Sequence, residues 1–400
     1  MFTGIEAPAA NSAAGRVRAL ETESAFTAAA RVQERRAAGL PVFDLSIGEP
    51  SEPPSPSIVE AAARALRDEP VRYTPPAGLP LLREAIASER TARGAPCSAA
   101  DVFVTPGAKQ ALLHAVLATV EPGAEVLLPD PGFRPWISQV HLAGGRPCAY
   151  PLTGPTGGPT ADAIAEHVTR RTRVLLLNAP GNPAGGAATA RELERIAELA
   201  RAHGLVVITD DIYARLWYGD GESAPLLADA AGALIAVDGF SKAWSMTGFR
   251  LGAVVAPARY HVALERLAVA THSCVPGFVQ AAGVAALAEA PERLRARVAR
   301  LRVSRDAGAV AFSRIPGVHC APPDGGLYLF PDCRALLAAL DTSDTALAQR
   351  LLTEHGIAVL AGSDFGPGGA GHLRLSLAAT RSALDAAAAA LDHISSTVLS

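Results

Sequence analysis

Lysine is almost absent from this 400-residue sequence, although 36 of its residues are lysine or arginine. Only Lys109 and Lys242 are lysines, so the remaining 34 basic residues are arginines. Arginine replaces lysine wherever only a positive charge is needed, but its guanidinium stays protonated and cannot attack a carbonyl. The two lysines are therefore the first candidates for chemistry.

Other shortages exclude several classes of protein. The five cysteines are scattered and form no CxxC pair: Cys97, Cys148, Cys274, Cys320 and Cys333. Their pattern argues against a disulfide framework or a metal site such as zinc, and favours reduced thiols in a cytoplasmic protein. A net charge of −3 provides no footprint for nucleic acid or a membrane surface. No apolar run is long enough to cross a bilayer, and residues 1–10 do not resemble a secretory signal.

What is present indicates an α/β protein. Short runs rich in Val, Ile and Leu predict strands at residues 102–105, 126–128, 174–178, 206–210, 234–238 and 252–256. Helical patterns lie between several of them, at residues 108–120, 191–203 and 257–270. This alternation predicts a mostly parallel sheet covered by helices on both faces, with ligands bound where loops leave the strand ends.

The pattern changes after about residue 277. A long helix is expected at residues 291–312, short strands at 326–330, 357–360 and 372–376, and a last helix at 381–393. These elements predict a second, smaller α+β domain. The first 45 or so residues, helical at 24–38, are expected to pack with it or against a partner subunit.

Lys242 lies in a glycine-containing connection between two predicted strands, within the sequence Gly239-Phe-Ser-Lys-Ala-Trp-Ser-Met-Thr-Gly-Phe-Arg250. A lysine that is partly desolvated at a sheet end and close to other cations has a lowered pKa and acts as an amine nucleophile. The alternative is an ordinary surface lysine with a solvated ammonium group.

Asp210 and Tyr213 follow the buried-strand pattern at residues 206–210. A carboxylate at this place would keep a pyridine nitrogen protonated, and the phenol three residues later would reach a ring oxygen. The alternative is a helix N-cap after the strand. Asp211 is expected to take that capping role while Asp210 points inward.

Two further segments follow predicted strands. Residues 178–186 form a Pro- and Gly-rich turn that needs no functional explanation on its own. Residues 105–111 join a strand to a helix, and the free N–H groups at a helix start make a phosphate seat. Lys109 or Thr105 would add a donor there and Arg250 a fixed positive charge. As a phosphate motif this is weak, because many helices begin with glycine.

Together and in this order, these segments resemble the fold-type I pyridoxal-phosphate enzymes of the class I/II aminotransferase group. Residues 45–50 are similar to that family's GEP segment, residues 72–83 to its YTP-AG-LR signature, and residues 371–376 to its H-R-S segment. The resemblance implies the aspartate-aminotransferase fold. A large domain, residues 49–277, would hold a seven-stranded sheet and the cofactor, pyridoxal 5′-phosphate. A small domain would combine residues 1–48, including an N-terminal arm, with residues 278–400.

The resemblance also implies roles for individual residues around the cofactor. Lys242 would form the Schiff base and shuttle the proton between the substrate α-carbon and the cofactor, while Asp210 would pair with the ring nitrogen. Tyr213 and Asn182 would hydrogen-bond the ring oxygen, and Phe133 would stack on the ring. The phosphate-binding residues would be Gly107, Ala108, Lys109 and Arg250, with Ser241 as a further candidate.

Substrate and partner contacts are implied in the same way. Arg374 would clamp the substrate carboxylate, assisted by Asn182 and the backbone near Gly48. Tyr73 would reach the cofactor phosphate of a neighbouring subunit, so the enzyme would be a homodimer with shared sites. Taken singly, Arg374 is also compatible with a surface arginine, Phe133 with the core and Tyr73 with packing.

The sequence departs from the family pattern in three places. Residues 182–185 read Asn-Pro-Ala-Gly and lack the threonine that usually follows the proline. Gly239 stands where some members place a phosphate-binding serine, and Ser241 or Ser245 would have to substitute. Arg134 and Trp136 lie beside the expected stacking ring, where they either reshape the substrate pocket or face solvent.

The function implied is transamination between an L-amino acid and a 2-oxo acid. The same site residues also serve racemases, lyases, decarboxylating enzymes and oxygen-using deaminases, so those outcomes stay open at this point. A transcription regulator built on this fold is disfavoured, because there is no room before residue 45 for a DNA-binding helix-turn-helix domain.

Overall fold

The computed structural model describes residues 14–18, 20–21, 23–221, 223–227 and 233–399. Its main sheet has seven strands, which lie in the spatial order β2 (Val102–Thr105), β8 (Gly252–Val255), β7 (Leu234–Gly239), β6 (Val206–Asp210), β5 (Thr172–Leu177), β3 (Glu125–Asp130) and β4 (Arg146–Pro151). Strand β8 is antiparallel to both neighbours, and every other pair is parallel. The predicted mostly parallel sheet is confirmed.

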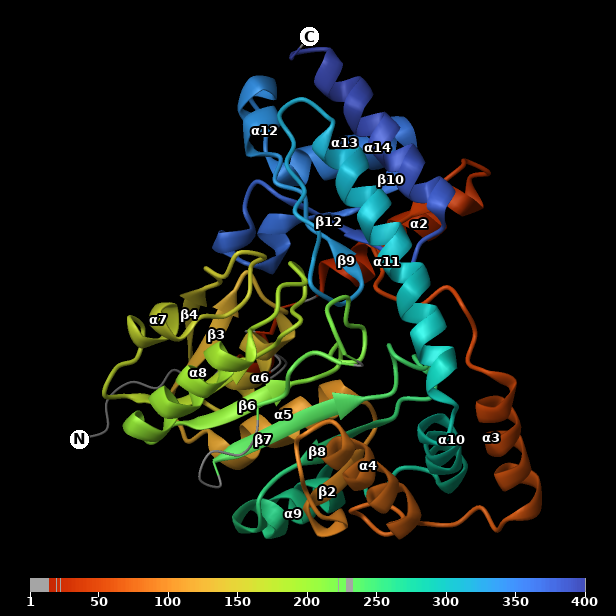
Figure 1. Ribbon diagram of the computed structural model, residues 1–400, viewed down its shortest axis with the longest axis vertical. Coiled ribbons are helices and arrows are strands. Elements are labelled where there is room, and N and C mark those ends of the chain that lie inside the picture. The colour runs from red at the N-terminus through yellow and green to blue at the C-terminus, as the bar shows by residue number, and fades with distance from the viewer. Residues whose placement is uncertain (1–13, 19, 22, 222, 228–232, 400) are drawn as a thin grey trace.

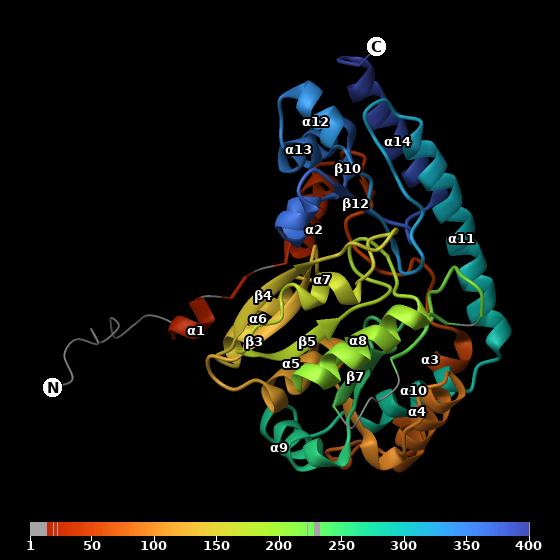
Figure 2. The ribbon, with the colours of Figure 1, turned by 60° about the vertical axis from the view of Figure 1, so that its left-hand side comes forward.

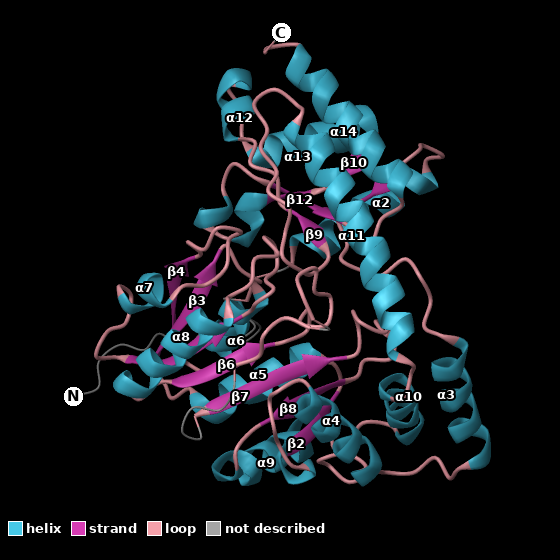
Figure 3. Ribbon diagram, in the orientation of Figure 1, coloured by secondary structure: helices cyan, strands magenta, loops and turns pink. Residues whose placement is uncertain are grey.

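Helices cover both faces of this sheet (Figure 1, Figure 3). One face carries α5 (Ala108–Thr119), α6 (Pro135–Leu142) and α9 (His261–Thr271). The other carries α3 (Pro56–Asp68), α4 (Pro80–Ala92), α7 (Ala161–Ala165), α8 (Ala190–His203) and α10 (Gly277–Leu287). Alternate residues of β3 pack against the two helix layers: Val126 and Leu128 lie on the first face and Leu127 on the second. Buried aliphatic side chains on both faces hold the sheet at the centre of the core.

A second group of elements lies above the main sheet in Figure 1. It contains an antiparallel sheet of order β11 (Leu360–Ala361), β12 (Leu373–Ser376) and β9 (Tyr328–Leu329), and the parallel pair β1 (Phe43–Asp44) and β10 (Ile357–Ala358). Its helices are α11 (Pro291–Ser313), α12 (Arg334–Leu340), α13 (Asp344–His355) and α14 (Arg381–Ser396). Helix α11 runs along one side of the molecule, from the level of the main sheet to these upper elements (Figure 2). The predicted strand at 357–360 is wrong, because the chain there forms two separate short strands.

The N-terminal segment contains α1 (Gly15–Arg18) and α2 (Ser24–Ala37), and α2 packs with the upper group as expected. Arg31 donates a hydrogen bond to Gln349 of α13, and Arg35 donates one to the carbonyl of Thr353 at 3.2 Å. The domain boundaries near residues 48 and 277 stay a prediction. Within the described part of the chain, no helix has both the length and the apolar character needed to cross a membrane.

Candidate active site

A cavity of about 500 Å³ lies at the carboxyl ends of β5, β6 and β7, between the main sheet and the upper elements. Most of the predicted site residues line it: Gly48, Ala108, Lys109, Phe133, Asn182, Asp210, Tyr213, Ser241, Lys242, Arg250 and Arg374. They come from segments spread over more than 300 residues of chain. Gly107 and Tyr73 are not among them, and Tyr73 is 91% exposed.

Lys242 lies in this cavity rather than on the outer surface. It follows β7 by three residues, and its ammonium group donates a hydrogen bond to the carbonyl oxygen of Gly48 at 2.7 Å. Gly48 belongs to the segment after β1, so this bond joins the main sheet to the N-terminal part of the chain. In the described chain, no carboxylate forms an ion pair with this amine.

Asp210 ends β6 with its carboxyl group buried beside the same cavity. One carboxyl oxygen accepts the N–H of Ile212 at 3.3 Å, and its backbone carbonyl accepts the amide of Asn178 at 2.8 Å. Burial raises the pKa of Asp210 to about 7, because the N–H of Ile212 and the ammonium of Lys242 compensate the loss of water only in part, and the charges of Asp211 and Asp238 oppose them. A cationic group bonded directly to the carboxyl group would lower that pKa again.

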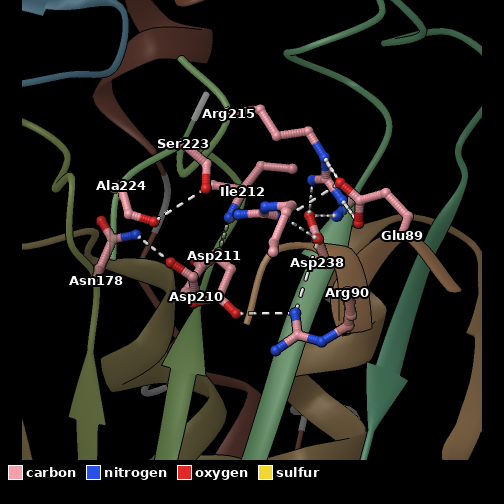
Figure 4. Close-up of polar contacts among 12 residues, drawn as sticks. Glu89, Arg90, Asn178, Asp210, Asp211, Ile212, Arg215, Ser223, Ala224 and Asp238 are labelled. Carbon is pink, nitrogen blue, oxygen red and sulfur yellow. Dashed lines mark hydrogen bonds and ion pairs between the residues drawn. The ribbon is translucent and has the colours of Figure 1, made fainter. Parts of the chain in front are cut away.

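The neighbouring carboxylates of Asp211 and Asp238 are instead held in ion pairs (Figure 4). Arg90 of α4 contacts Asp211 at 3.0 Å, and Arg215 bridges Asp238 at 2.8 Å and Glu89 at 2.7 Å. Although burial alone would raise it, Arg215 holds the pKa of Asp238 below its usual value. The expectation that Asp211 caps a helix is wrong, since the residues after it form turns and its carboxylate binds Arg90.

The start of α5 forms a narrow seat beside Arg250. Gly107 is the N-cap of α5 with φ of 87°, and a Cβ there would lie 2.5 Å from a guanidinium nitrogen of Arg250. Gly239 also lies close, since a Cβ on it would meet Ala108 at 3.1 Å. The free N–H groups of α5 and the guanidinium of Arg250 thus converge at one place, which suits a phosphate group.

Two hydroxyl groups were open candidates to replace the serine missing at Gly239. Ser241 lines the cavity, whereas the hydroxyl of Ser245 is buried and has no hydrogen-bond partner among the described residues. Thr105 donates its hydroxyl to the carbonyl of Gly107 at 3.1 Å and does not line the cavity. Ser241 is therefore the hydroxyl placed to contact a ligand.

Phe133 presents its ring to the cavity and is supported from behind by Trp136, whose ring stands edge-on at 5.8 Å. Trp136 is 1% exposed and belongs to the core. Arg134 forms a bidentate pair with Glu21, at 2.9 and 2.7 Å. Neither Arg134 nor Trp136 lines this cavity, so one fastens the N-terminal segment and the other supports the ring.

Arg374 is a buried cation without a carboxylate partner in the described chain. It donates to the side-chain oxygen of Asn182 at 3.2 Å and to the carbonyl of Ser46. Its guanidinium lies between the rings of Tyr328, at 4.2 Å, and Phe365, at 4.9 Å. Its Nε has no hydrogen-bond partner there. A fixed, unpaired guanidinium of this kind is suited to bind a carboxylate through two parallel bonds.

The cavity-lining residues that the sequence reasoning missed include Glu23, Phe26 and Tyr328. The hydroxyl of Tyr328 lies 3.0 Å from that of Tyr213, and a Cβ at Gly48 would lie 1.8 Å from it. Its position in a two-residue strand offered no motif. Glu23 and Phe26 belong to an N-terminal segment whose contacts with the main sheet no local pattern predicted.

Known proteins resemble this chain over almost its whole length. The family model of aminotransferase class I and II matches residues 41–391. An aspartate aminotransferase from Musicola paradisiaca is 34% identical over 394 residues, covering 97% of this chain and 96% of the relative. An arginine–pyruvate transaminase from Pseudomonas aeruginosa is 35% identical over 360 residues, 88% of each chain. The crystal structure of an aspartate aminotransferase from Rhizobium meliloti has a TM-score of 0.90 at 28% identity, covering 97% of this chain and 100% of that one.

The chain therefore belongs to the aminotransferase class I and II family. It has the aspartate-aminotransferase fold and is an aminotransferase.

The cavity also fits pyridoxal phosphate, the cofactor of this family. Lys242 offers an amine for the aldehyde, and buried Asp210 offers a carboxyl group that forms no ion pair with a described residue. The start of α5 with Arg250 suits the phosphate, and the ring of Phe133 suits the flat face. Each chemical part of the cofactor thus has a matching group.

Proposed function

We propose that this aminotransferase binds pyridoxal phosphate covalently through Lys242 and moves an amino group between an L-amino acid and a 2-oxo acid. The observation that carries the proposal is the shared cavity of the amine of Lys242 and the buried carboxyl of Asp210. When bound, the cofactor supplies an electron sink for the bonds at the substrate α-carbon.

The residues around the cavity have different roles in cofactor binding, proton transfer and substrate binding. Asp210 would hold a proton on the ring nitrogen, and the hydroxyl of Tyr213 and the amide of Asn182 would bind the ring oxygen. The amine of Lys242 would take the proton from the substrate α-carbon and deliver it to the carbon of the cofactor that carried the aldehyde oxygen. Arg374 binds the substrate α-carboxylate, with Asn182 beside it.

Phosphate binding falls to a separate group of residues. The backbone of Gly107, Ala108 and Lys109 would form the phosphate seat at the start of α5, with free N–H groups on Ala108 and Lys109, since the N–H of Gly107 donates to the carbonyl of Thr105 at 2.7 Å. Arg250 and Ser241 would add side-chain donors.

We infer that the working unit is a homodimer in the cytoplasm, with Tyr73 completing the phosphate site of the partner subunit. Exposed apolar side chains close to Tyr73 in the sequence support this interface, because Val71 is 67% exposed and Leu81 is 63% exposed. Five cysteines without a disulfide support the reducing compartment.

The test is a half-reaction of the purified, cofactor-loaded protein with a panel of L-amino acids. At least one amino acid should convert the bound cofactor to its amine form, with release of the matching 2-oxo acid in equal amount. Release of CO₂, consumption of oxygen or inversion of the donor without an oxo acid would instead contradict transamination.

A further inference from the structure

We propose that Glu23 makes this site select amino donors with uncharged, apolar or aromatic side chains over aspartate and glutamate. This inference rests on the proposed transamination and names the class of donor that the same cavity accepts.

The cavity has few basic side chains, and most of them already have a role in the proposed reaction. Four basic side chains line it, and three of them are used by the proposed chemistry: Lys242, Arg250 and Arg374. A dicarboxylic donor needs one more cation for its second carboxylate. Lys109 is the one that remains among the described lining residues.

Lys109 is already neutralised by the chain itself. Its ammonium group forms an ion pair with the carboxylate of Glu23, which precedes α2. Glu23 stands at the N-cap of α2 but makes no capping hydrogen bond with its side chain. The carboxylate is directed to Lys109 instead, and its side chain is only 22% exposed.

A carboxylate on a substrate would therefore meet a pair without net charge. It would either remain beside Glu23, where like charges repel, or displace Glu23 and lose that ion pair. An uncharged side chain meets neither cost.

The neighbouring surfaces favour apolar groups. The ammonium of Lys109 lies 5.8 Å from the ring centre of Phe26 and 5.5 Å from that of Phe133. Phe26 lines the cavity yet is 68% exposed, so an apolar donor side chain would remove part of its surface from water.

An adjoining cavity of about 390 Å³ has Glu23, Phe133 and Arg374 in common with the first. It also offers no net positive charge for a second substrate carboxylate. Besides these shared residues, its charged lining residues are the acids Glu21 and Asp364 and the bases Arg31 and Arg134, which balance. Arg134 is bound by Glu21, so this space adds no net positive charge.

The test is the ratio of kcat/KM for phenylalanine to that for aspartate, measured on the cofactor-loaded enzyme. Wild type should prefer phenylalanine, and Glu23→Gln should shift the ratio toward aspartate by roughly tenfold, the effect of about 1.4 kcal/mol. Adding Lys109→Met to Glu23→Gln should abolish that gain. Glu34→Gln, the same change at an exposed position of α2, should leave the ratio as in wild type.

The affinity for unreactive carboxylic acids tests the same selectivity without catalytic turnover. Calorimetry of wild type should give tighter binding of 3-phenylpropionate than of succinate, and Glu23→Gln should narrow the difference. Preference of wild type for aspartate and succinate, or an unchanged ratio in Glu23→Gln, would overturn the inference. A protein that binds both acids but converts no amino acid would refute the proposed transamination instead.

Discussion

Three carboxyl groups at the ends of two adjacent strands have different surroundings and therefore different uses. Asp211 and Asp238 are held by Arg90 and Arg215, whereas Asp210 borders the cavity and forms no ion pair with a described residue. An unpaired buried acid is costly, and such groups concentrate where a ligand supplies the missing charge. Asp210 is for this reason the strongest single indication of a cationic ligand.

This environment predicts a specific pH dependence for Asp210→Asn. Burial raises the pKa of Asp210 to about 7, from roughly 3.9 in an unfolded chain. Between these values the native state holds a proton that the unfolded state releases, so the free energy of unfolding falls as pH rises. Without cofactor, wild type should lose more stability from pH 5 to pH 8 than Asp210→Asn, by on the order of a few kcal/mol.

Urea unfolding of both cofactor-free proteins at the two pH values measures this difference. Equal losses in wild type and Asp210→Asn would show that the carboxyl group titrates normally, and the assigned environment would be wrong.

The sequence identified a site residue whose chemistry no other residue type can replace. It did not identify site residues that reach the cavity only through tertiary contacts. Lys242 stood out because arginine replaces lysine almost everywhere else in the chain. Tyr328 contacts Tyr213 across 115 residues, and Glu23 contacts Lys109 across 86. Neither belongs to a local pattern, so only the folded chain brings them to the cavity.

At the scale of elements, the phosphate seat depends on how closely β8 approaches the start of α5. A Cβ at Gly252 would lie 2.5 Å from the backbone nitrogen of Ala108 and 2.5 Å from the carbonyl carbon of Gly107. Backbone atoms cannot move aside as a flexible side chain does, so this approach requires glycine.

Gly252→Ala should therefore displace the start of α5, weaken cofactor binding and destabilise the protein by about 1–3 kcal/mol. Thermal unfolding and titration with pyridoxal phosphate measure the two effects. Gly248→Ala is the control, because a Cβ there meets nothing within 4 Å and should change stability by less than about 0.5 kcal/mol. Similar behaviour of both variants would contradict the close approach.

The charge network ties α4 to the strands that carry the site. Arg215 bonds both Glu89 of α4 and Asp238 of β7, and all three side chains are largely buried. Arg215→Met should destabilise the protein by roughly 3–5 kcal/mol, because it removes the short contacts to two buried carboxylates and leaves them only longer ones, from Arg93 to Glu89 at 3.5 Å and from Arg90 and Arg93 to Asp238 at 3.8 and 3.7 Å.

Arg67→Met provides the matched control in chemical denaturation, since the Arg67–Glu60 pair is exposed and should contribute less than about 1 kcal/mol. A loss for Arg215→Met no larger than for Arg67→Met would mean that the network does not hold α4 in place.

Element prediction from the sequence succeeded where apolar runs were uninterrupted. The expected strands at 102–105, 206–210 and 234–238 are present as β2, β6 and β7. Strand β4 was not predicted, because it contains Pro147 and Pro151 and lies at the sheet edge, where proline is tolerated. The expected helix at 257–270 starts with a 3₁₀ turn at Ala258–Tyr260, and α9 begins only at His261.

For the whole molecule, the cavity is assembled from parts that the chain separates widely. Gly48 comes from the segment after β1, Lys242 from the loop after β7 and Arg374 from β12. The fold class followed from the alternation of strands and helices, but the junction of the two groups of elements rests on contacts that no sequence pattern specifies.

A homodimer with shared sites predicts that the protein sediments at twice its chain mass of 41.1 kDa. Tyr73→Phe should lower the affinity for pyridoxal phosphate by roughly tenfold, because one hydrogen bond to the charged phosphate is lost. The variant should remain dimeric in sedimentation velocity. A monomer with full cofactor affinity in wild type would rule out the shared site.

The most direct measurement of the central claim is reduction of the cofactor-loaded protein with borohydride, followed by mass mapping of its peptides. Reduction fixes a lysine–aldehyde bond, and the chain offers only Lys109, Lys242 and its N-terminus as primary amines. We predict one phosphopyridoxyl group per chain, on Lys242, and none in Lys242→Arg. A label on Lys109, or no label in a protein that contains the cofactor, would contradict the account.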